Sequence, residues 1–178
     1  MSSLRMAISV LRAGGIIAHH SDTVLGLACL PQAASLARLS RIKMRPLNKP
    51  FLLLASSLPQ LSDFVAEDIN LESALTAHLT PTTCLIKANP TCPTALIGPS
   101  QQVAVRLSQH PNVIALSQAL GALASTSANL SGQDTALSLI GLRKQFGPEL
   151  DYLYDSGNSG SGESSRIIDL STQQILRA

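Results

Sequence analysis

The sequence predicts one α/β or α+β domain, residues 1–178, built on a single mixed β-sheet flanked by helices. Short apolar runs of strand length alternate along the whole chain with segments of helical periodicity. Of the 178 residues, 45% are hydrophobic and 13% are charged, so one compact core can form without disulfides or a structural metal. Only 3% are aromatic, so we expect an aliphatic core and no binding of single-stranded nucleic acid on rows of stacked rings.

The first third of the chain predicts two helices and two strands. Leu4, Ile8 and Leu11 recur at helical spacing, and a pair of glycines follows them and ends the helix. A later helix must end before Pro46, because the residue that precedes a proline avoids helical backbone angles. The expected elements are a helix before Gly14, strands at 15–19 and 25–30, and a helix at 31–44.

The central part predicts three strands and two helices. Its first strand is wholly apolar, as in strands buried on both faces of a sheet. In its last strand, alternation predicts that Val103, Val105 and Leu107 face inward. Prolines and a glycine predict a loop at 89–102. The expected elements are strands at 51–55, 82–87 and 103–107 and helices at 58–65 and 70–79.

The last part predicts two helices and four short strands. Gly147 and Pro148 close the second of these helices. Residues 157–162 consist almost entirely of Gly and Ser, and they predict a flexible loop that is either a tolerant surface loop or a lid over a site. The expected elements are helices at 111–120 and 136–146 and strands at 122–126, 152–154, 166–170 and 174–176.

The charge and the cysteines of the chain restrict its class. The net charge is +2, too small to indicate a polyanionic partner by itself, but residues 1–60 hold seven Arg and Lys against one acid, Asp22. The three cysteines are odd in number and far apart, which favours neither a disulfide framework nor a zinc site. No apolar run approaches the ~18 residues of a membrane span. We therefore expect a cytoplasmic protein that does not associate with a membrane.

A basic segment braced by two prolines is the first candidate for chemistry. Lys43, Arg45 and Lys49 lie on a turn that Pro46 and Pro50 stiffen, so their charged ends can converge on phosphate oxygens. The alternative is a solvated basic helix end, where cations are also favourable.

The segment 125–132 is the second candidate, because it holds four hydroxyls and one amide after an apolar run. Small side chains let backbone N–H groups approach an anion, although the same residue types are also typical of helix caps and turns. The usual P-loop, Rossmann and nucleophile-elbow motifs are absent. We expect the segment 125–132 and the basic segment to share one cavity that holds a nucleotide's phosphates. Arg106, on an otherwise apolar strand, either faces solvent or reaches an anion in a cleft.

Four segments, in this order and spacing, resemble the YrdC-like family over about residues 13–177. They are His20-Ser-Asp-Thr-Val-Leu-Gly-Leu27, Lys43-x-Arg-Pro46 with Lys49-Pro50, Val103-Ala-Val-Arg-Leu-x-x-His110 and Ser125-Thr-Ser-Ala-Asn-Leu-Ser-Gly132. The resemblance implies a twisted mixed sheet with a positively charged concave face. It also implies a nucleotidyltransferase that makes threonylcarbamoyl-AMP from L-threonine, bicarbonate and ATP, releases pyrophosphate, and supplies threonylcarbamoyl-adenosine modification of tRNA.

The same resemblance implies the residue roles. ATP would be bound by Lys43, Arg45, Lys49, Ser127, Asn129, Thr135 and Arg177, with Lys43 and Arg45 as the catalytic cations. L-threonine would be bound by Thr23, Arg106, Ser125 and Ser165. Mg²⁺ would accompany ATP, and no protein metal site is expected. The partners would be RNA or tRNA and proteins of the TsaB, TsaD and TsaE type.

The chain departs from the family pattern in two places. It has His20-Ser21-Asp22-Thr23 where the family usually has Pro-Thr-Glu-Thr, and His78-Leu-Thr-Pro-Thr-Thr83 where the family has Trp-Pro-Gly-Pro-x-Thr. Two alternatives to the synthase therefore stay open. One is an RNA-binding module without catalysis, and the other is a nucleotide-binding paralogue whose reaction is lost or altered.

Overall fold

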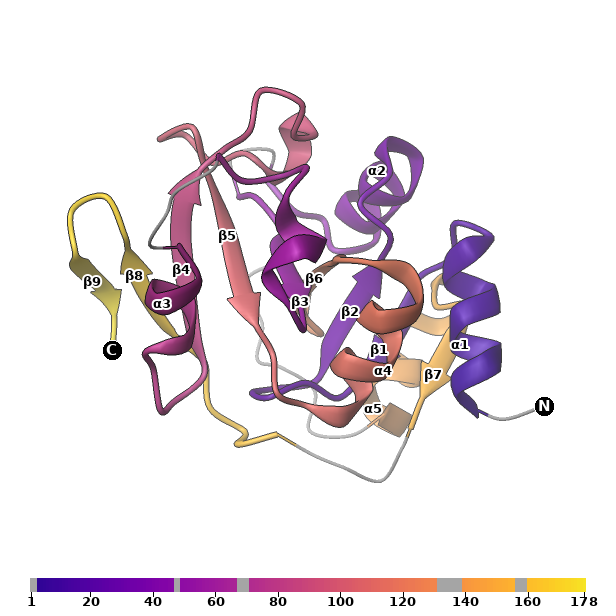
Figure 1. Cartoon of the computed structure of the whole chain (residues 1–178). Coiled ribbons are helices and arrows are strands. Elements are labelled where there is room, and N and C mark those ends of the chain that lie inside the picture. The colour runs from indigo at the N-terminus through magenta and orange to yellow at the C-terminus, as the bar shows by residue number, and fades with distance from the viewer. Residues whose placement is uncertain (1–2, 47–48, 67–70, 131–138, 156–159) are drawn as a thin grey trace.

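The computed structural model describes residues 3–46, 49–66, 71–130, 139–155 and 160–178, which form one mixed sheet with helices packed on it (Figure 1). Its nine strands lie in the order β7-β1-β2-β6-β3-β5-β4-β8-β9. The strands are β1 (Ile17–His19), β2 (Gly26–Cys29), β3 (Leu52–Ala55), β4 (Thr82–Lys87), β5 (Gln102–Leu107), β6 (Leu123–Ser127), β7 (Tyr152–Tyr154), β8 (Arg166–Asp169) and β9 (Gln174–Arg177). The α-helices are α1 (Ser3–Arg12), α2 (Ala33–Ile42), α3 (Leu71–Thr76), α4 (Pro111–Leu120) and α5 (Leu139–Phe146).

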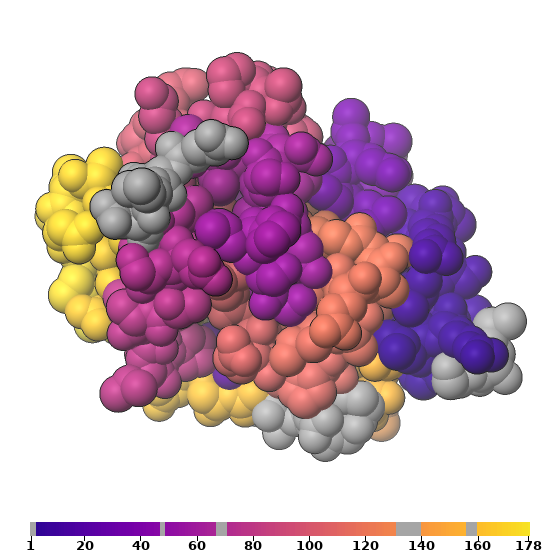
Figure 2. All heavy atoms as spheres, in the orientation of Figure 1, coloured from indigo at the N-terminus to yellow at the C-terminus, as the bar shows by residue number. Residues whose placement is uncertain are grey.

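The sheet is mixed, as predicted. β1 pairs parallel with β7, β3 with β5, and β4 with β8, whereas the other neighbouring strands are antiparallel. The N-terminal helix α1 and the C-terminal β8–β9 hairpin lie at opposite margins of the molecule (Figures 1 and 2). The centre of the sheet combines β2, β6, β3 and β5, so the segments that carry the candidate residues meet there although they are far apart in sequence.

Two apolar clusters stabilise the sheet. The smaller joins α1 and α4 to Ile17, Ala28 and Leu123. The larger includes Ala18 and Leu53 together with apolar side chains of α2, α3 and α5. Adjacent residues of a strand point to opposite faces, so the two clusters lie on opposite faces of the sheet at β1. The smaller cluster covers only part of its face, and the rest of that face carries the site described below.

One predicted helix is wrong. Residues 58–65 form only a short 3-10 turn, Leu58–Leu61, and no α-helix. The chain then turns back toward the end of β4, where Val65 forms a bridge with Ala88 and the N–H of Ala66 donates to Lys87 O. This long-range pairing prevails over the local helical pattern. The predicted loop 89–102 contains another short 3-10 turn, Thr94–Leu96.

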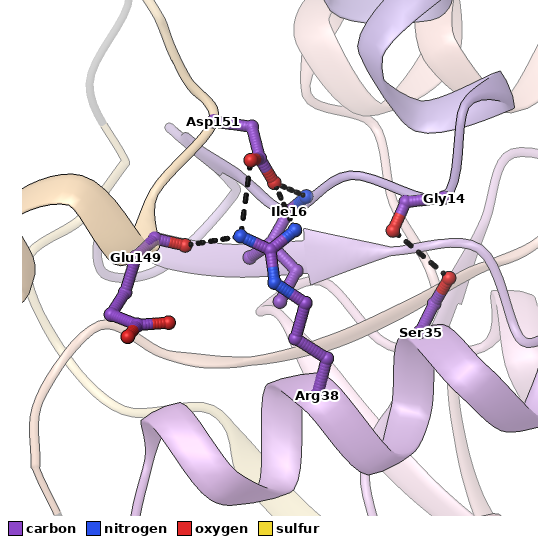
Figure 3. A network of polar contacts seen from close by, with 6 residues as sticks. All are labelled: Gly14, Ile16, Ser35, Arg38, Glu149 and Asp151. Atoms are coloured by element: carbon purple, nitrogen blue, oxygen red, sulfur yellow. Dashed lines mark hydrogen bonds and ion pairs between the residues drawn. The ribbon is translucent and has the colours of Figure 1, made fainter.

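A polar network fastens α2 to the edge of the sheet (Figure 3). The Arg38 guanidinium forms an ion pair with Asp151, with an Nη1 to Oδ2 distance of 2.5 Å, and donates to Glu149 O. The N–H of Ile16, which precedes β1, also donates to Asp151 Oδ2 at 2.7 Å. Burial would raise the pKa of Asp151, but these two donors together hold it below its usual value. The start of β1 is thereby held against α2, which leads into the basic segment.

Candidate active site

A cavity of about 250 Å³ opens on the sheet face that α1 and α4 leave uncovered. Residues spaced by two along a strand share a face. On β6, Leu123 packs in the smaller apolar cluster, whereas Ser125 and Ser127 line the cavity. The described polar residues that line it are Ser21, Thr23, Arg45, Thr83, Arg106, Ser125, Thr126, Ser127, Ser164, Ser165 and Arg177. Among these there are three arginines and no carboxylate.

The basic segment and the hydroxyl-rich segment do share this cavity. Arg45 and Pro50 of the first line it together with Ser125, Thr126 and Ser127 of the second. They meet because β6 lies between β2 and β3 in the sheet, and β3 starts two residues after Pro50. The predicted meeting of the two segments at one cavity is confirmed for Arg45, Pro50 and residues 125–127.

Arg106 reaches into the cavity from β5 and is only 5% exposed. Its Nε and Nη2 donate to Thr83 Oγ1 at 3.3 and 2.9 Å, and its Nη1 donates to Thr23 Oγ1 at 3.1 Å. Burial lowers the pKa of Arg106 to about 10, so the guanidinium stays charged near neutral pH. These three bonds leave two of its five N–H groups for an anion. Of the two possibilities left open by the sequence, Arg106 therefore faces a cleft.

A second arginine is connected to Arg106 through hydroxyl groups. Thr83 Oγ1 lies 2.9 Å from Ser165 Oγ, and Ser165 accepts from Arg177 at both its carbonyl and its hydroxyl oxygen. Thr83 already accepts from Arg106, so its own hydroxyl proton is directed at Ser165. The chain Arg106–Thr83–Ser165–Arg177 thus joins β5, β4 and β9 along one wall of the cavity.

Arg45 is placed by the way α2 ends. Met44 has a φ of 48°, and the N–H groups of Met44 and Arg45 donate to Arg41 O and Ser40 O, as in a Schellman motif. This turn sends the Arg45 side chain toward β6, where Nη1 donates to Thr126 Oγ1 at 3.1 Å. Its Nε and Nη2 donate to the carbonyl oxygens of two residues that precede β3, Lys49 and Pro50. Two N–H groups of Arg45 remain for a ligand.

Lys43 takes a different course from the one expected. It is 1% exposed and does not line the cavity. Its Nζ donates to Ser127 O at 2.5 Å, to Asn129 Oδ1 at 2.9 Å and to Asn129 O. An ammonium has three N–H donors, and these three oxygens occupy them all. The expectation that Lys43 contacts ATP phosphates is therefore not met in this geometry; Lys43 holds the 127–129 turn from behind.

Two further expected ATP residues, Lys49 and Asn129, are among the described residues but do not line the cavity. Lys49 is exposed, and its carbonyl oxygen rather than its ammonium takes part by accepting from Arg45. Asn129 instead shapes the turn after β6 by accepting from Lys43 and from Ser127 Oγ at 2.7 Å. Thr135 lies outside the described residues. The other expected residues, Thr23, Arg45, Arg106, Ser125, Ser127, Ser165 and Arg177, all line the cavity.

Sequence reasoning missed two hydroxyl groups that carry much of this geometry. Thr83 is the acceptor for Arg106, and Thr126 is the acceptor for Arg45. Each had a signal in the sequence, because Thr83 ends one of the segments compared with the family pattern and Thr126 lies within the hydroxyl-rich segment. Their roles depend on cross-strand distances, which a single sequence does not contain.

The turn between β1 and β2 is clamped from two sides. Asp22 stands where the family pattern usually has a glutamate. Its carboxylate accepts from Ser108 Oγ at 2.5 Å and from the Gln109 N–H at 3.0 Å, both just beyond the end of β5. From the other side, Ser161 N donates to Asp22 O and Gly162 N donates to Thr23 O. The described part of the Gly- and Ser-rich loop therefore rests on the cavity turn; residues 157–159 lie outside the described residues.

Residues 9–178 match the Sua5/YciO/YrdC family model, whose description is "Telomere recombination". The chain belongs to this family. Among curated members it is 36% identical to a threonylcarbamoyl-AMP synthase of Xanthomonas axonopodis pv. citri, with 98% of this chain and 96% of that protein covered. It is also 36% identical to a threonylcarbamoyl-AMP synthase of Vibrio cholerae, with 99% and 97% covered.

Solved structures of the Sua5/YciO/YrdC family share the fold. P. abyssi Sua5 complexed with L-threonine superposes with a TM-score of 0.86 at 25% identity, covering 96% of this chain. This chain spans 52% of that longer one. E. coli YciO superposes with a TM-score of 0.80 at 24% identity, covering 98% of this chain and 87% of that one. The expected family fold is confirmed.

Within the described ranges, no three His, Cys, Asp or Glu side chains lie close enough together to hold a metal ion. In the same ranges, no helix has the length and apolarity needed to cross a membrane.

Proposed function

We propose that this protein is a threonylcarbamoyl-AMP synthase, which joins L-threonine, bicarbonate and ATP and releases pyrophosphate. The observation that carries the proposal is the placing of Arg45 and Arg106 on one cavity that three hydroxyl residues of β6 also line. Each guanidinium is held by three hydrogen bonds to the protein and keeps two N–H groups for a ligand. Two anionic groups, a carboxylate and a phosphate, suit this arrangement.

The amino-acid subsite is assigned to Arg106. Thr23 and Thr83 hold its planar guanidinium in one orientation, so its two remaining N–H groups can donate to a carboxylate as a bidentate pair. Ser125 and Ser165 supply further hydroxyls beside it. The similar P. abyssi Sua5 has been solved in complex with L-threonine, which supports an amino acid as the ligand here.

The nucleotide subsite is assigned to Arg45 and Ser127. Arg45 faces the phosphates, with Lys43 supporting the Ser127–Asn129 turn from behind. Phe51 braces the Arg45 guanidinium, which lies 5.0 Å from the ring centre. Arg177 lies at the opposite wall, near the chain end, and is placed to close over the nucleotide. Mg²⁺ would enter with the ATP phosphates as part of the substrate.

The reaction needs positioning and charge neutralisation more than a protein nucleophile. The threonine amine attacks the bicarbonate carbon, and water leaves to give a carbamate. A carbamate oxygen then attacks the α-phosphorus of ATP, and the bond to pyrophosphate breaks. Arg106 aligns threonine by binding its carboxylate, and Arg45 neutralises the charge that develops on the ATP phosphates.

The product would serve the threonylcarbamoyl-adenosine modification of tRNA in the cytoplasm. TsaB-, TsaD- and TsaE-type proteins would receive it, with or without direct contact between this chain and tRNA. The curated synthases, similar over nearly their full length, support this placement.

The test is pyrophosphate release with each substrate omitted in turn. A synthase releases pyrophosphate only when ATP, L-threonine and bicarbonate are all present. Release that does not depend on threonine would overturn the proposal. An RNA-binding module would instead release none and would bind RNA with an affinity that falls steeply with salt.

A further inference from the structure

His19 is a buried group that the proposed reaction does not yet use. It is the last residue of β1 and is 0% exposed. Its ring lies on the cavity face of the sheet, because its register partner is Gly26, which lines the cavity. A histidine at this position is therefore next to the site without opening into it.

The hydrogen bonds of the His19 ring define what its second nitrogen can do. Nδ1 lies 2.9 Å from His20 O, and a carbonyl oxygen only accepts, so Nδ1 carries the proton. Burial, opposed by that hydrogen bond, lowers the pKa of His19 to about 4, which keeps the ring neutral near pH 7. Nε2 is then an acceptor, and within the described part of the chain it has no hydrogen-bond partner. A buried acceptor without a partner is unfavourable and requires an explanation.

Gly26 leaves a space that Nε2 shares with one cavity hydroxyl. A Cβ on Gly26 would lie 3.4 Å from His19 Nε2 and 3.3 Å from Ser125 Oγ. Ser125 lies two positions along the ladder from Ser127, the register partner of Gly26, so it shares their face of the sheet, and it also lines the cavity. Its hydroxyl makes no hydrogen bond to any of the described residues, unlike that of Ser127, which donates to Asn129. An acceptor and a hydroxyl thus both border the small space that the missing Gly26 side chain leaves.

We propose that His19 is a positioning residue that fixes the hydrogen-bond polarity of Ser125. When a ligand fills the cavity, the Ser125 O–H donates to His19 Nε2, and the Ser125 oxygen lone pairs turn toward the cavity. Ser125 can then accept from an N–H of the amino-acid amine but cannot donate to it. The amine must keep its lone pair for the bicarbonate carbon, so a hydroxyl that only accepts is the useful one. This assignment rests on the proposed function.

The test is a double-mutant cycle on L-threonine affinity, measured by calorimetry on the full chain. His19→Phe removes the acceptor and Ser125→Ala removes the hydroxyl. We expect each to weaken threonine binding by about 3- to 10-fold, the effect of one hydrogen bond of this kind. Because His19 acts through Ser125, His19→Phe should add almost nothing in the Ser125→Ala background.

Two further variants separate positioning from a general structural role. Ser127→Ala is the matched control, and its effect should add to that of His19→Phe because Ser127 donates to Asn129 instead. His19→Gln keeps an acceptor at similar reach and should restore threonine affinity to within about twofold of the unaltered protein. If His19→Phe does not fold, His19→Leu replaces it in the same cycle, and His19→Gln remains the rescue variant.

The outcomes are distinct. Effects of His19 and Ser125 that simply add would overturn the assignment of His19 and leave the proposed function standing. No rescue by His19→Gln would do the same. Failure of the unaltered protein to bind L-threonine would overturn the proposed function and this assignment with it.

Discussion

Lys43 and Asn129 are joined by two hydrogen bonds, one to the side-chain oxygen at 2.9 Å and one to the carbonyl oxygen. The ammonium that the sequence assigns to phosphate is thus committed to the turn that follows β6. Asn129 Oδ1 also accepts from the hydroxyl of Ser127, a residue that lines the cavity, so Lys43 helps to fix Ser127 as well. The basic segment therefore contributes one cation to the cavity surface, Arg45, and one to its support.

Removing the Lys43 charge should change how stability depends on pH. Burial and the nearby Arg45 charge lower the pKa of Lys43 from 10.5 to about 7. Between these values the unfolded chain binds more protons than the folded one, so the free energy of unfolding gains a contribution that rises with pH. In Lys43→Met this rise should be absent. Urea unfolding of both proteins at several pH values gives the free energy of unfolding as a function of pH, and the difference between the two curves measures the effect. Equal pH dependence in the two proteins would contradict the burial of the Lys43 charge.

Arg45→Ala should weaken ATP binding. It removes two free N–H donors from the cavity and the bond to Thr126, and a hydrogen bond to a charged group contributes about 1.5–3 kcal/mol. Arg41→Ala is the matched control, because Arg41 is an exposed cation in the last turn of α2, four residues before Arg45, and does not line the cavity. Calorimetry with ATP should separate the two variants, and equal losses would indicate a general effect of charge.

Arg106→Ala should raise the L-threonine requirement far more than the ATP requirement. Arg106→Lys should rescue little, because one ammonium cannot replace a planar group that bonds Thr23, Thr83 and a carboxylate together. Steady-state kinetics with each substrate varied in turn provide the comparison. If only the ATP requirement rises, the two subsites are assigned the wrong way round.

Gly160→Ala should release the loop that rests on the β1–β2 turn. A Cβ there would lie 2.2 Å from Ser21 O and 2.3 Å from Thr23 O, both rigid backbone atoms, so the loop must move. Hydrogen exchange should then increase at the amides of Ser161 and Gly162, and threonine affinity should fall because Ser164 and Ser165 follow directly. Gly98→Ala is the control, since its nearest atoms would lie at 3.4 and 3.5 Å. Unchanged exchange in Gly160→Ala would show that the loop is not docked.

Local patterns in the sequence predict most of the fold. The strands and the longer helices follow from apolar runs, periodicity and breaking residues, because these signals lie within each segment. The helix predicted for residues 58–65 is wrong because their conformation depends on the pairing of Val65 with Ala88, which the local pattern does not contain.

The residues of the candidate site also fall into those that the sequence predicts and those that it does not. Arg45, Arg106 and Ser125 could be chosen from their residue types and motif positions. The inward direction of the Lys43 side chain could not be predicted. It depends on the left-handed turn at Met44 and on carbonyl oxygens more than 80 residues away, and a pattern of side chains does not show where backbone acceptors lie.

The most direct test of the synthase activity is product analysis with ¹³C-labelled bicarbonate. The protein is incubated with ATP, L-threonine and the label, and the nucleotide products are examined by mass spectrometry. The account requires a new species that contains AMP, threonine and the labelled carbon, formed together with pyrophosphate. Conversion of ATP to ADP or AMP with no labelled threonine adduct would contradict it.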